Sequence, residues 1–389
     1  MPLRFLSGGE SHGKGLLLVI EGMPSHLCVG KERLVKELAR RRRGYGRGPR
    51  MKLEKDVLTA WGGLRGGVTT GSPLCFSVEN TEWHEWENIM DPWRVGDASG
   101  MEVTRPRPGH ADLPGAVKYD HSDIRNVLER GSARSTAAWT VAGTVARTLL
   151  EELGVTVRSA VTAIGGIEIS PPVSAEEWDV AARSDLGCPR ARDERQLMER
   201  IGTAKNDGDT LGGTFILSAE GLPPGIGSYA EWDRRLDGLI AGALISIPAV
   251  KGVEVGMGFG LASVCGSMAH DEILPGGEYG WHRETNNAGG IEGGMTNGEE
   301  VVFSAAMKPI PTLKKPLRSI DIRSGTKKEA VFERSDVCVV PAACVVGEAM
   351  LSWVLAGAVM EQFGGDTLDD LAERWNSYKD RVRCFIHEQ

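Results

Sequence analysis

The chain has 389 residues, a net charge of −8 at pH 7, and 41% hydrophobic and 25% charged residues. This composition is ordinary for a globular protein, but the length exceeds the usual domain size of about 100–200 residues and predicts a large or duplicated fold. The acidic balance disfavours a nucleic-acid binder, and no apolar run approaches the ~18 residues of a membrane span. Seven scattered cysteines without a CxxC pair indicate neither a metal site nor a disulfide framework, and fit the reducing cytoplasm.

The N-terminal segment is predicted to be a strand at 3–6, a glycine-rich loop at 8–15 and a second strand at 16–20. The loop sequence GGESHGKG fits part of the phosphate loop of a kinase or ATPase, but Gly15 stands where a Ser or Thr hydroxyl would hold magnesium. It also fits the GxSxG nucleophile elbow of an esterase, which needs a helix after the turn. The remaining interpretations are an ordinary turn and a glycine hairpin that presents His12 to a ligand.

Residues 31–43 are predicted to form a helix that ends in four arginines, 40–43, before the sequence GYG. Cations suit the C-terminus of a helix, so a solvated helix end is the simplest interpretation. Four consecutive residues cannot share one face, so we expect some of these arginines to point to solvent and some into a site. Arg47 lies between glycines and is a stronger candidate, because guanidinium groups bind carboxylates and phosphates bidentately. The patch favours a small anionic substrate over a nucleic acid.

The Trp-rich stretch 81–97 is expected to be an extended loop. The following sequence, RPRPGHADLPG, places Arg105, Arg107 and His110 in a loop that proline and glycine stiffen. Neighbouring positive charge disfavours a protonated histidine unless an anion binds beside it. A bound phosphate would reverse that effect and make His110 a plausible acid; a purely structural turn is the alternative.

A long helix is predicted at 132–153, beginning with the sequence SAR. Ser132 is a natural N-cap, and the free N–H groups of a helix N-terminus bind anions. Arg130 and Arg134 add positive charge, so the segment is either an anion site or an ordinary cap. The later predicted elements are a strand and turn at 155–169, a helix capped by Ser174 and Glu177, strands near 214–219, 253–259 and 301–307, a helix from 231, and a mainly helical region from 345.

Segments near the C-terminus carry weaker signals. The prolines of KPIPTLKKPL, residues 308–317, make that segment extended and place Lys308 and Thr312 where they can line a cofactor. In the sequence FERSDVCVVPAAC, Arg334 and Asp336 share one face of an extended segment. They form either an ion pair at a strand end or a carboxylate base beside an arginine-bound anion.

One internal similarity stands out between residues 62–71 and 289–298. The sequences GGLRGGVTTG and GGIEGGMTNG agree at six of ten positions without gaps, and a strand-like run follows each. The match predicts a structural duplication. Residues 1–389 would then form one unit with two related halves and a shared cleft, rather than two unrelated domains.

Together these segments resemble the chorismate synthase family over nearly the whole chain. The ordered motifs are GESHG (9–13), GYGRG–RM (44–51), RPGHAD (107–112), SAR (132–134), AVKGVE–G–GF (249–259), NNAGGIEGG–TNG (286–298), MKPIPTL (307–313), RSD–C–VPAA (334–343) and GEAM (347–350). The resemblance implies an α+β fold, an internally duplicated β-α-β sandwich with helices between two antiparallel sheets, assembled as a homotetramer. It also implies a shikimate-pathway lyase that converts 5-enolpyruvylshikimate-3-phosphate to chorismate and phosphate by anti-1,4-elimination with reduced FMN.

The resemblance assigns roles to residues of this chain. His110 would supply a proton near the departing phosphate, His12 would lie by the flavin ring, and Asp336 would help to remove the C6 proton by way of flavin N5. The residues implied to bind substrate or NADPH are Arg41, Arg47 and Arg134. Those implied to contact flavin are Arg130, Gly131, Ser132, Gly242, Ala243, Gly293, Lys308, Pro309, Ile310, Pro311, Thr312 and Arg334.

The sequence departs from the family pattern at two positions. Ser135 stands where many relatives have Glu, and Gly242 stands where many have Gln. The second change removes a side chain and weakens the prediction of one flavin contact. NADPH is a candidate reductant for the flavin, although no GxGxxG dinucleotide motif follows a predicted strand.

Overall fold

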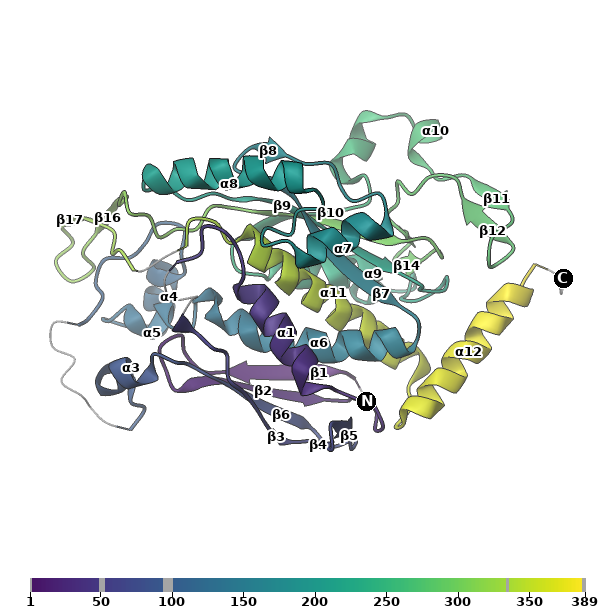
Figure 1. The fold of residues 1–389 in the computed structure, drawn as a ribbon, viewed down its shortest axis with the longest axis horizontal. Helices are drawn as coiled ribbons and strands as arrows, with labels where there is room; N and C mark the ends of the chain where they lie inside the picture. Colours follow the sequence, from purple (N-terminus) through teal and green to yellow (C-terminus); the bar gives the residue numbers. More distant parts are fainter. Residues whose placement is uncertain (1, 49–52, 94–100, 334–335, 387–389) are drawn as a thin grey trace.

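The computed structural model describes residues 2–48, 53–93, 101–333 and 336–386. A layer of helices lies between antiparallel sheets (Figure 1). One sheet has the order β1–β2–β6–β3, with bounds Arg4–Gly8, Gly15–Glu21, Leu74–Glu79 and Leu58–Gly62. Another has the order β10–β15–β9–β7–β8, with bounds Val250–Val255, Val301–Met307, Gly213–Glu220, Thr156–Ile164 and Ile167–Glu168.

Strand β2 shows why this segment forms a sheet with one core face. Leu16, Leu18 and Ile20 are buried, whereas Leu17 and Val19 are exposed on the opposite face. Successive side chains of a strand point to opposite faces, so this alternation places the buried leucines and isoleucine against the helix layer.

The predicted strands on both sides of the 8–15 loop are confirmed. β1 and β2 pair antiparallel, and Gly8 opposite Leu17 is the pair nearest the turn. A strand therefore follows Lys14, and the segment lacks the helix N-terminus that a phosphate loop or a nucleophile elbow requires.

The helix layer contains α1, α6 and α11, with bounds Lys31–Arg42, Thr136–Glu152 and Val340–Phe363. Most residues of α6 and of the first half of α11 are buried, as expected for central helices. These helices approach closely at Gly143, where an added Cβ would lie 2.2 Å from the carbonyl oxygen of Ala349. A methyl group does not fit there, so the approach depends on glycine.

Helix α11 has the length and hydropathy of a membrane span, which the sequence analysis did not expect. In the fold, 78% of its most apolar window is buried inside the protein. It packs against α6 and β7. Its apolar surface is therefore accounted for by the core.

Helices α7 and α8, Ala175–Arg183 and Ala191–Asn206, lie on the outer side of the β7–β9 sheet (Figure 1). The predicted cap is confirmed, because the Ser174 hydroxyl accepts the N–H of Glu177 at 3.2 Å. Trp178 packs on Ala160 of β7. By contrast, the outer face of β2 leaves Leu17 and Val19 exposed.

Several predicted bounds are wrong. Residues Trp83–Met90 form helix α3 rather than an extended loop, and 94–97 lie outside the described residues. β10 begins and ends earlier than 253–259, because a 3-10 helix, η3, Gly258–Ser263, follows it. The helix expected at 132–153 starts as the 3-10 turn η1, Ala133–Ser135, and α11 begins before 345.

The similar glycine-rich sequences form similar hairpins. The strands are β4–β5 (Leu64–Arg65, Val68–Thr69) and β13–β14 (Ile291–Glu292, Met295–Thr296). The Thr69 hydroxyl accepts the N–H of Leu27 at 2.9 Å, and the Thr296 hydroxyl accepts that of Ile226 at 2.9 Å. Each hydroxyl also donates to a proline carbonyl at 2.6 Å.

The remaining elements gather at opposite ends of the molecule in Figure 1. At one end lie α4, α5, β16 and β17, with bounds Asp112–Tyr119, Arg125–Leu128, Arg318–Ile320 and Lys327–Glu329. Toward the other lie α10, β11, β12 and α12, with bounds Gly266–Ala269, Ile273–Pro275, Trp281–Arg283 and Leu368–Cys384. η2, Trp232–Arg234, and α9, Leu236–Ile245, lead into β10.

Candidate active site

His12 lies in the turn between β1 and β2, and its side chain is 12% exposed. Its Nδ1 lies 3.0 Å from each carboxylate oxygen of Glu129. Its ring stacks on Trp86 of α3 with centroids 4.1 Å apart. The imidazole is therefore held by specific contacts on its edge and its face, unlike the side chain of an ordinary exposed turn.

Glu129 directly follows α5, and its side chain is fully buried. Its carboxylate accepts hydrogen bonds from the backbone N–H of His12 at 2.9 Å and from Arg125 Nη1 at 3.2 Å. Burial alone would raise the pKa of Glu129, but its hydrogen bonds from His12 and the charge of Arg125 outweigh burial and lower it. The carboxylate is thus ionised beside His12 at neutral pH.

His110 has a similar carboxylate partner. Its Nδ1 lies 2.6 Å from Oδ1 of the fully buried Asp112, and Arg107 donates to the same carboxylate from Nε at 2.8 Å and from Nη2 at 3.0 Å. Burial alone would raise the pKa of Asp112, but the hydrogen bonds from His110 and Arg107 lower it below its usual range. This neutralising carboxylate was not foreseen from the sequence, which showed only the positive charge around His110. Arg105 is exposed.

A single short segment, residues 129–132, links both histidines. The carbonyl of Glu129 accepts the N–H of Ser11, and Ser132 Oγ donates to Ser11 Oγ at 3.2 Å. A Cβ added to Gly131 would lie 3.4 Å from Cε1 of His110. The predicted cofactor residues Gly131 and Ser132 therefore lie between His12 and His110.

Residues of the 308–317 segment reach the His110 loop, a contact that was not predicted from the sequence. Lys308 Nζ donates to the carbonyl of Gly109, and the Thr312 hydroxyl accepts from Arg107 Nη1 at 3.0 Å. Ile310 accepts from the hydroxyl of Thr210 at 2.8 Å. Lys308 and Thr312 thus join the neighbourhood of His110. Pro309 and Pro311 belong to the same connecting segment.

Arg41, at the end of α1, is a buried cation. It donates to the Thr136 hydroxyl at 3.2 Å and to the carbonyl of Arg134 at 3.5 Å, and no ion pair joins it to a described residue. Burial lowers the pKa of Arg41 to about 9, assisted by Arg134 and other arginines and opposed by Asp56. It still carries its charge at pH 7, so a bound anion would gain a strong partner.

Arg134 has protein partners for each of its donor groups. Nε donates to Asn80 Oδ1 at 2.9 Å, Nη1 contacts Asp56, and Nη2 donates to the carbonyl of Glu79 at 3.0 Å. Asn80 in turn donates to the carbonyl of Gly13 at 2.7 Å. In this state Arg134 supports the turn that carries His12.

Arg47 and Asp336 form an ion pair, with Nε 3.2 Å from Oδ2. Asp336 also accepts the N–H of Gly48 at 2.5 Å. Both Nε and Nη1 of Arg47 are buried, and neither makes a hydrogen bond to a described residue, Nε meeting Asp336 only as an ion pair. The expected Arg334 partner of Asp336 lies outside the described residues.

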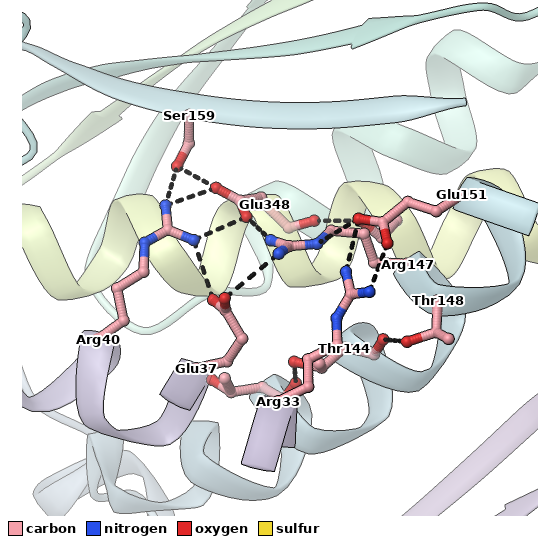
Figure 2. Close-up of polar contacts among 11 residues, drawn as sticks. Arg33, Glu37, Arg40, Thr144, Arg147, Thr148, Glu151, Ser159 and Glu348 are labelled. Atoms are coloured by element: carbon pink, nitrogen blue, oxygen red, sulfur yellow. Dashed lines mark hydrogen bonds and ion pairs between the residues drawn. The ribbon is translucent and has the colours of Figure 1, made fainter. Parts of the chain in front are cut away.

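The arginine run 40–43 divides between different surroundings. Arg40, Arg42 and Arg43 are partly exposed, whereas Arg41 is buried. Arg41 lies at the site, whereas Arg40 belongs to a network behind it that contains Glu37, Arg147 and Glu348 (Figure 2). Arg42 pairs with Asp56, with Nε 3.1 Å from Oδ2.

The other predicted flavin residues are more scattered. Arg130 donates to the carbonyls of Ser7 and Gly9 at 2.8 and 3.1 Å. Gly242 and Ala243 lie in α9, which starts beside the β13–β14 hairpin that carries Gly293, because Leu236 donates to Gly294. At the other end of α9 the chain leads to Ala249, whose carbonyl accepts the N–H of Lys308.

The sequence analysis did not find Glu129, Asp112 or Trp86. Asp112 lies two residues after His110 within the quoted motif, so its proximity was available as a signal. Glu129 and Trp86 are distant from His12 in sequence, and nothing in the sequence alone pairs them with it.

Comparison with known proteins agrees with this arrangement. The chorismate synthase family model matches residues 3–360. The chorismate synthase of Desulforudis audaxviator is 52% identical over 385 residues, covering 98% of each chain. That of Desulforamulus reducens is 52% identical over 384 residues, covering 98% of this chain and 99% of the relative.

A solved structure extends the similarity to the fold. A crystal structure of a chorismate synthase superposes with a TM-score of 0.80 at 38% identity, covering 99% of both chains. The resemblance seen in the sequence motifs is thus confirmed over the whole length. This chain belongs to the chorismate synthase family, a family of lyases in aromatic amino acid biosynthesis.

Proposed function

We propose that this protein converts 5-enolpyruvylshikimate-3-phosphate to chorismate and phosphate by anti-1,4-elimination, with reduced FMN as cofactor. The observation that carries the proposal is the segment 129–132, which holds His12 and His110 near each other. Buried arginines lie close by, at the start of the helix that follows this segment. A substrate with carboxylate and phosphate groups matches such a positive, desolvated surface.

His110 is the proposed proton donor to the departing phosphate. The 2.6 Å contact from Nδ1 to Asp112 is shorter than the 3.1 Å contact to Arg107, and favours a proton on Nδ1. Nε2 is then the ring nitrogen that can donate to a phosphate oxygen. The lowered pKa of Asp112 keeps its carboxylate ionised, and this stabilises a positive imidazolium.

Arg41 and Arg47 are the proposed anion-binding residues. Arg41 is buried without a carboxylate bridge to a described residue, and Arg47 has buried N–H groups without hydrogen-bond partners among those residues. A substrate anion that binds both would satisfy these donors and screen their mutual repulsion. It would also compete with Asp336 for Arg47, and leave the Asp336 carboxylate able to take up a proton. Arg134 would act by supporting the His12 turn.

The residues present fit a flavin nucleotide, and membership of the family implies a flavin-dependent enzyme. Lys308 offers a cation, Gly131 presents backbone without a side chain beside His110, and α9 connects the Gly293 hairpin to the Lys308 segment. The other residues proposed to hold FMN are Arg130, Ser132, Gly242, Ala243, Pro309, Ile310, Pro311, Thr312 and Arg334. When bound, reduced FMN would supply the electron density that assists loss of phosphate.

Further expectations accompany this function. We propose that the chain is one duplicated unit. Without β8, the second sheet runs β7–β9–β15–β10, which is the same chain-order pattern (first, second, fourth, third) as β1–β2–β6–β3. The pairs Ile20–Leu74 and Ala219–Val301 occupy corresponding places in these two sheets. A cytoplasmic homotetramer is proposed from family resemblance. NADPH is proposed as a reductant for the flavin.

Anaerobic turnover tests the function. Purified protein is mixed with 5-enolpyruvylshikimate-3-phosphate and dithionite-reduced FMN, and chorismate absorbance and phosphate release are followed together. Equal amounts of both products, absent with oxidised FMN, are expected. Folded, flavin-binding protein that makes neither product would overturn the substrate assignment.

A further inference from the structure

We infer that Glu129 is the positioning residue of His12: its carboxylate keeps a proton on Nδ1 and leaves Nε2 as the ring nitrogen that serves the ligand. This inference rests on the proposed place of His12 beside the flavin. It concerns a group that contacts neither substrate nor cofactor and acts only through the imidazole.

The groups around the Glu129 carboxylate determine which ring nitrogen of His12 carries a proton. Oε2 accepts the backbone N–H of His12 at 2.9 Å, and Oε1 accepts Nη1 of Arg125 at 3.2 Å. An ionised carboxylate can only accept, so His12 Nδ1, 3.0 Å away, must be a donor to share this contact. The carboxylate therefore selects the Nδ1–H tautomer, or the imidazolium, over the Nε2–H tautomer.

A closed set of contacts joins His12, Trp86, Arg125 and Glu129. His12 stacks on Trp86 with an interplanar angle of 24°, and the guanidinium of Arg125 lies 5.0 Å from the centre of the Trp86 ring. Arg125 then returns to Glu129. The imidazole is fixed both in its plane and along its edge, as the orienting partner of a catalytic histidine requires.

The contact between Glu129 and His12 is shielded from water. The Glu129 side chain has no exposed surface, and the side chain of Arg125 is 9% exposed. Other charged groups reach the cluster at its margins: Glu333 lies 3.8 Å from Arg125, and Lys14 lies over Trp83 beside the same turn. A buried contact of this kind is costly to leave half satisfied, so it is strong enough to hold one tautomer.

Glu129→Gln tests the inference with little change in shape. A carboxamide has one acceptor and one donor end, so it must place its NH2 group against Arg125, the His12 N–H or Nδ1. We expect a histidine-labelled ¹⁵N spectrum to show Nδ1 of His12 protonated in the wild-type protein and a shifted tautomer population in Glu129→Gln. The His12 signals are assigned by their loss in His12→Ala.

Turnover provides the second readout, with oxidised-FMN binding measured alongside. We expect Glu129→Gln to lower kcat about 10–100-fold, with KM changed much less, as for other residues that orient a catalytic ligand. In a His12→Ala background the same substitution should have no further effect, because its action passes through the imidazole. Glu129→Asp, which keeps the charge on a shorter arm, should recover part of kcat.

Glu220→Gln is the matched control, since it removes an exposed carboxylate that pairs with Arg158 between β9 and β7, in a different sheet from the strands that flank His12. An unchanged His12 tautomer in folded Glu129→Gln would overturn the inference, as would equal losses from Glu129→Gln with and without His12. If the wild-type protein makes no chorismate, the proposed function fails, while the ¹⁵N spectra still decide whether Glu129 sets the tautomer.

Discussion

Two faces of α1 place consecutive arginines in contrasting electrostatic surroundings. On one face, Arg40 of α1 and Arg147 of α6 both pair with the carboxylates of Glu37 and Glu348 (Figure 2). Arg40 donates to Glu348 at 2.7 and 2.8 Å. On another face of the helix, Arg41 is more deeply buried, with 3% of the residue exposed against 11% of the Arg40 side chain, and it has no ion pair with a described residue.

The contrast separates a structural use of arginine from a binding use. A buried cation with carboxylates on several sides joins elements together, and the network ties α1 to α6 and α11. A buried cation without such a partner is electrostatically costly until an anion arrives. Consecutive residues of a helix differ by about 100° in direction, which allows Arg40 and Arg41 to serve these opposite purposes.

The largest expected effect is at the site and affects turnover alone. His110→Ala should lower kcat by about 10²–10⁴-fold, the usual contribution of general acid–base catalysis, because Asp112 and Arg107 remain but no proton donor does. Flavin binding and the unfolding transition should change little. Stopped-flow turnover with flavin titration measures this, and loss of flavin binding with normal turnover of the remaining holoenzyme would contradict the assigned role.

Breaking the network of Glu37, Arg40, Arg147 and Glu348 should lower the stability of the fold. Glu348→Gln leaves Arg40 and Arg147 poorly compensated in the core, and we expect a loss of about 3–5 kcal/mol in the free energy of unfolding. Denaturant titration measures it. Glu151→Gln is the internal control: that carboxylate is 38% exposed, and its loss should cost no more than about 1 kcal/mol.

Arg41→Met should produce the reverse pattern. It removes a buried cation that has no ion pair with a described residue, so the free energy of unfolding should stay level or rise, by about 1 kcal/mol. Affinity for the anionic substrate should fall, giving about 10²-fold lower kcat/KM, within the range for a buried charged partner. A variant as unstable as Glu348→Gln would show that Arg41 belongs to the structural class.

The smallest effect is a pH dependence of stability carried by Glu37. Burial alone would raise its pKa, but Arg147 and Arg40 outweigh burial and hold it below the ordinary value of 4.5. A carboxyl with a lowered folded-state pKa stabilises the fold above its unfolded pKa, and this stabilisation is lost as pH falls through the folded value. The stability difference between wild type and Glu37→Gln should therefore be constant at pH 6–7 and shrink below about pH 4.5. A difference that grows toward acid pH would contradict the assignment.

The sequence allowed prediction of features carried by local patterns. The strands β1 and β2, the Ser174 cap and the loop that carries His110 follow from short-range rules. The contacts that Lys308 and Thr312 make with that loop span 199 and 205 residues and were not predicted. α3 was missed because its Trp-rich, polar sequence has little apolar periodicity, and its helix is stabilised in part by tertiary contacts such as Trp86 on His12. The Arg40 and Arg41 environments depend on partners more than 90 residues away, such as Thr136 and Glu348.

The missing side chain of Gly143 has an electrostatic consequence. Gly143 lies one helical turn before Arg147, and Ala349, which it touches, directly follows Glu348. The close approach of α6 and α11 at Gly143 therefore also brings Arg147 into contact with Glu348. A methyl group at position 143 would wedge the helices apart and stretch that ion pair. The buried ion pair between Arg147 and Glu348 thus depends on a glycine that has neither a charge nor a side chain.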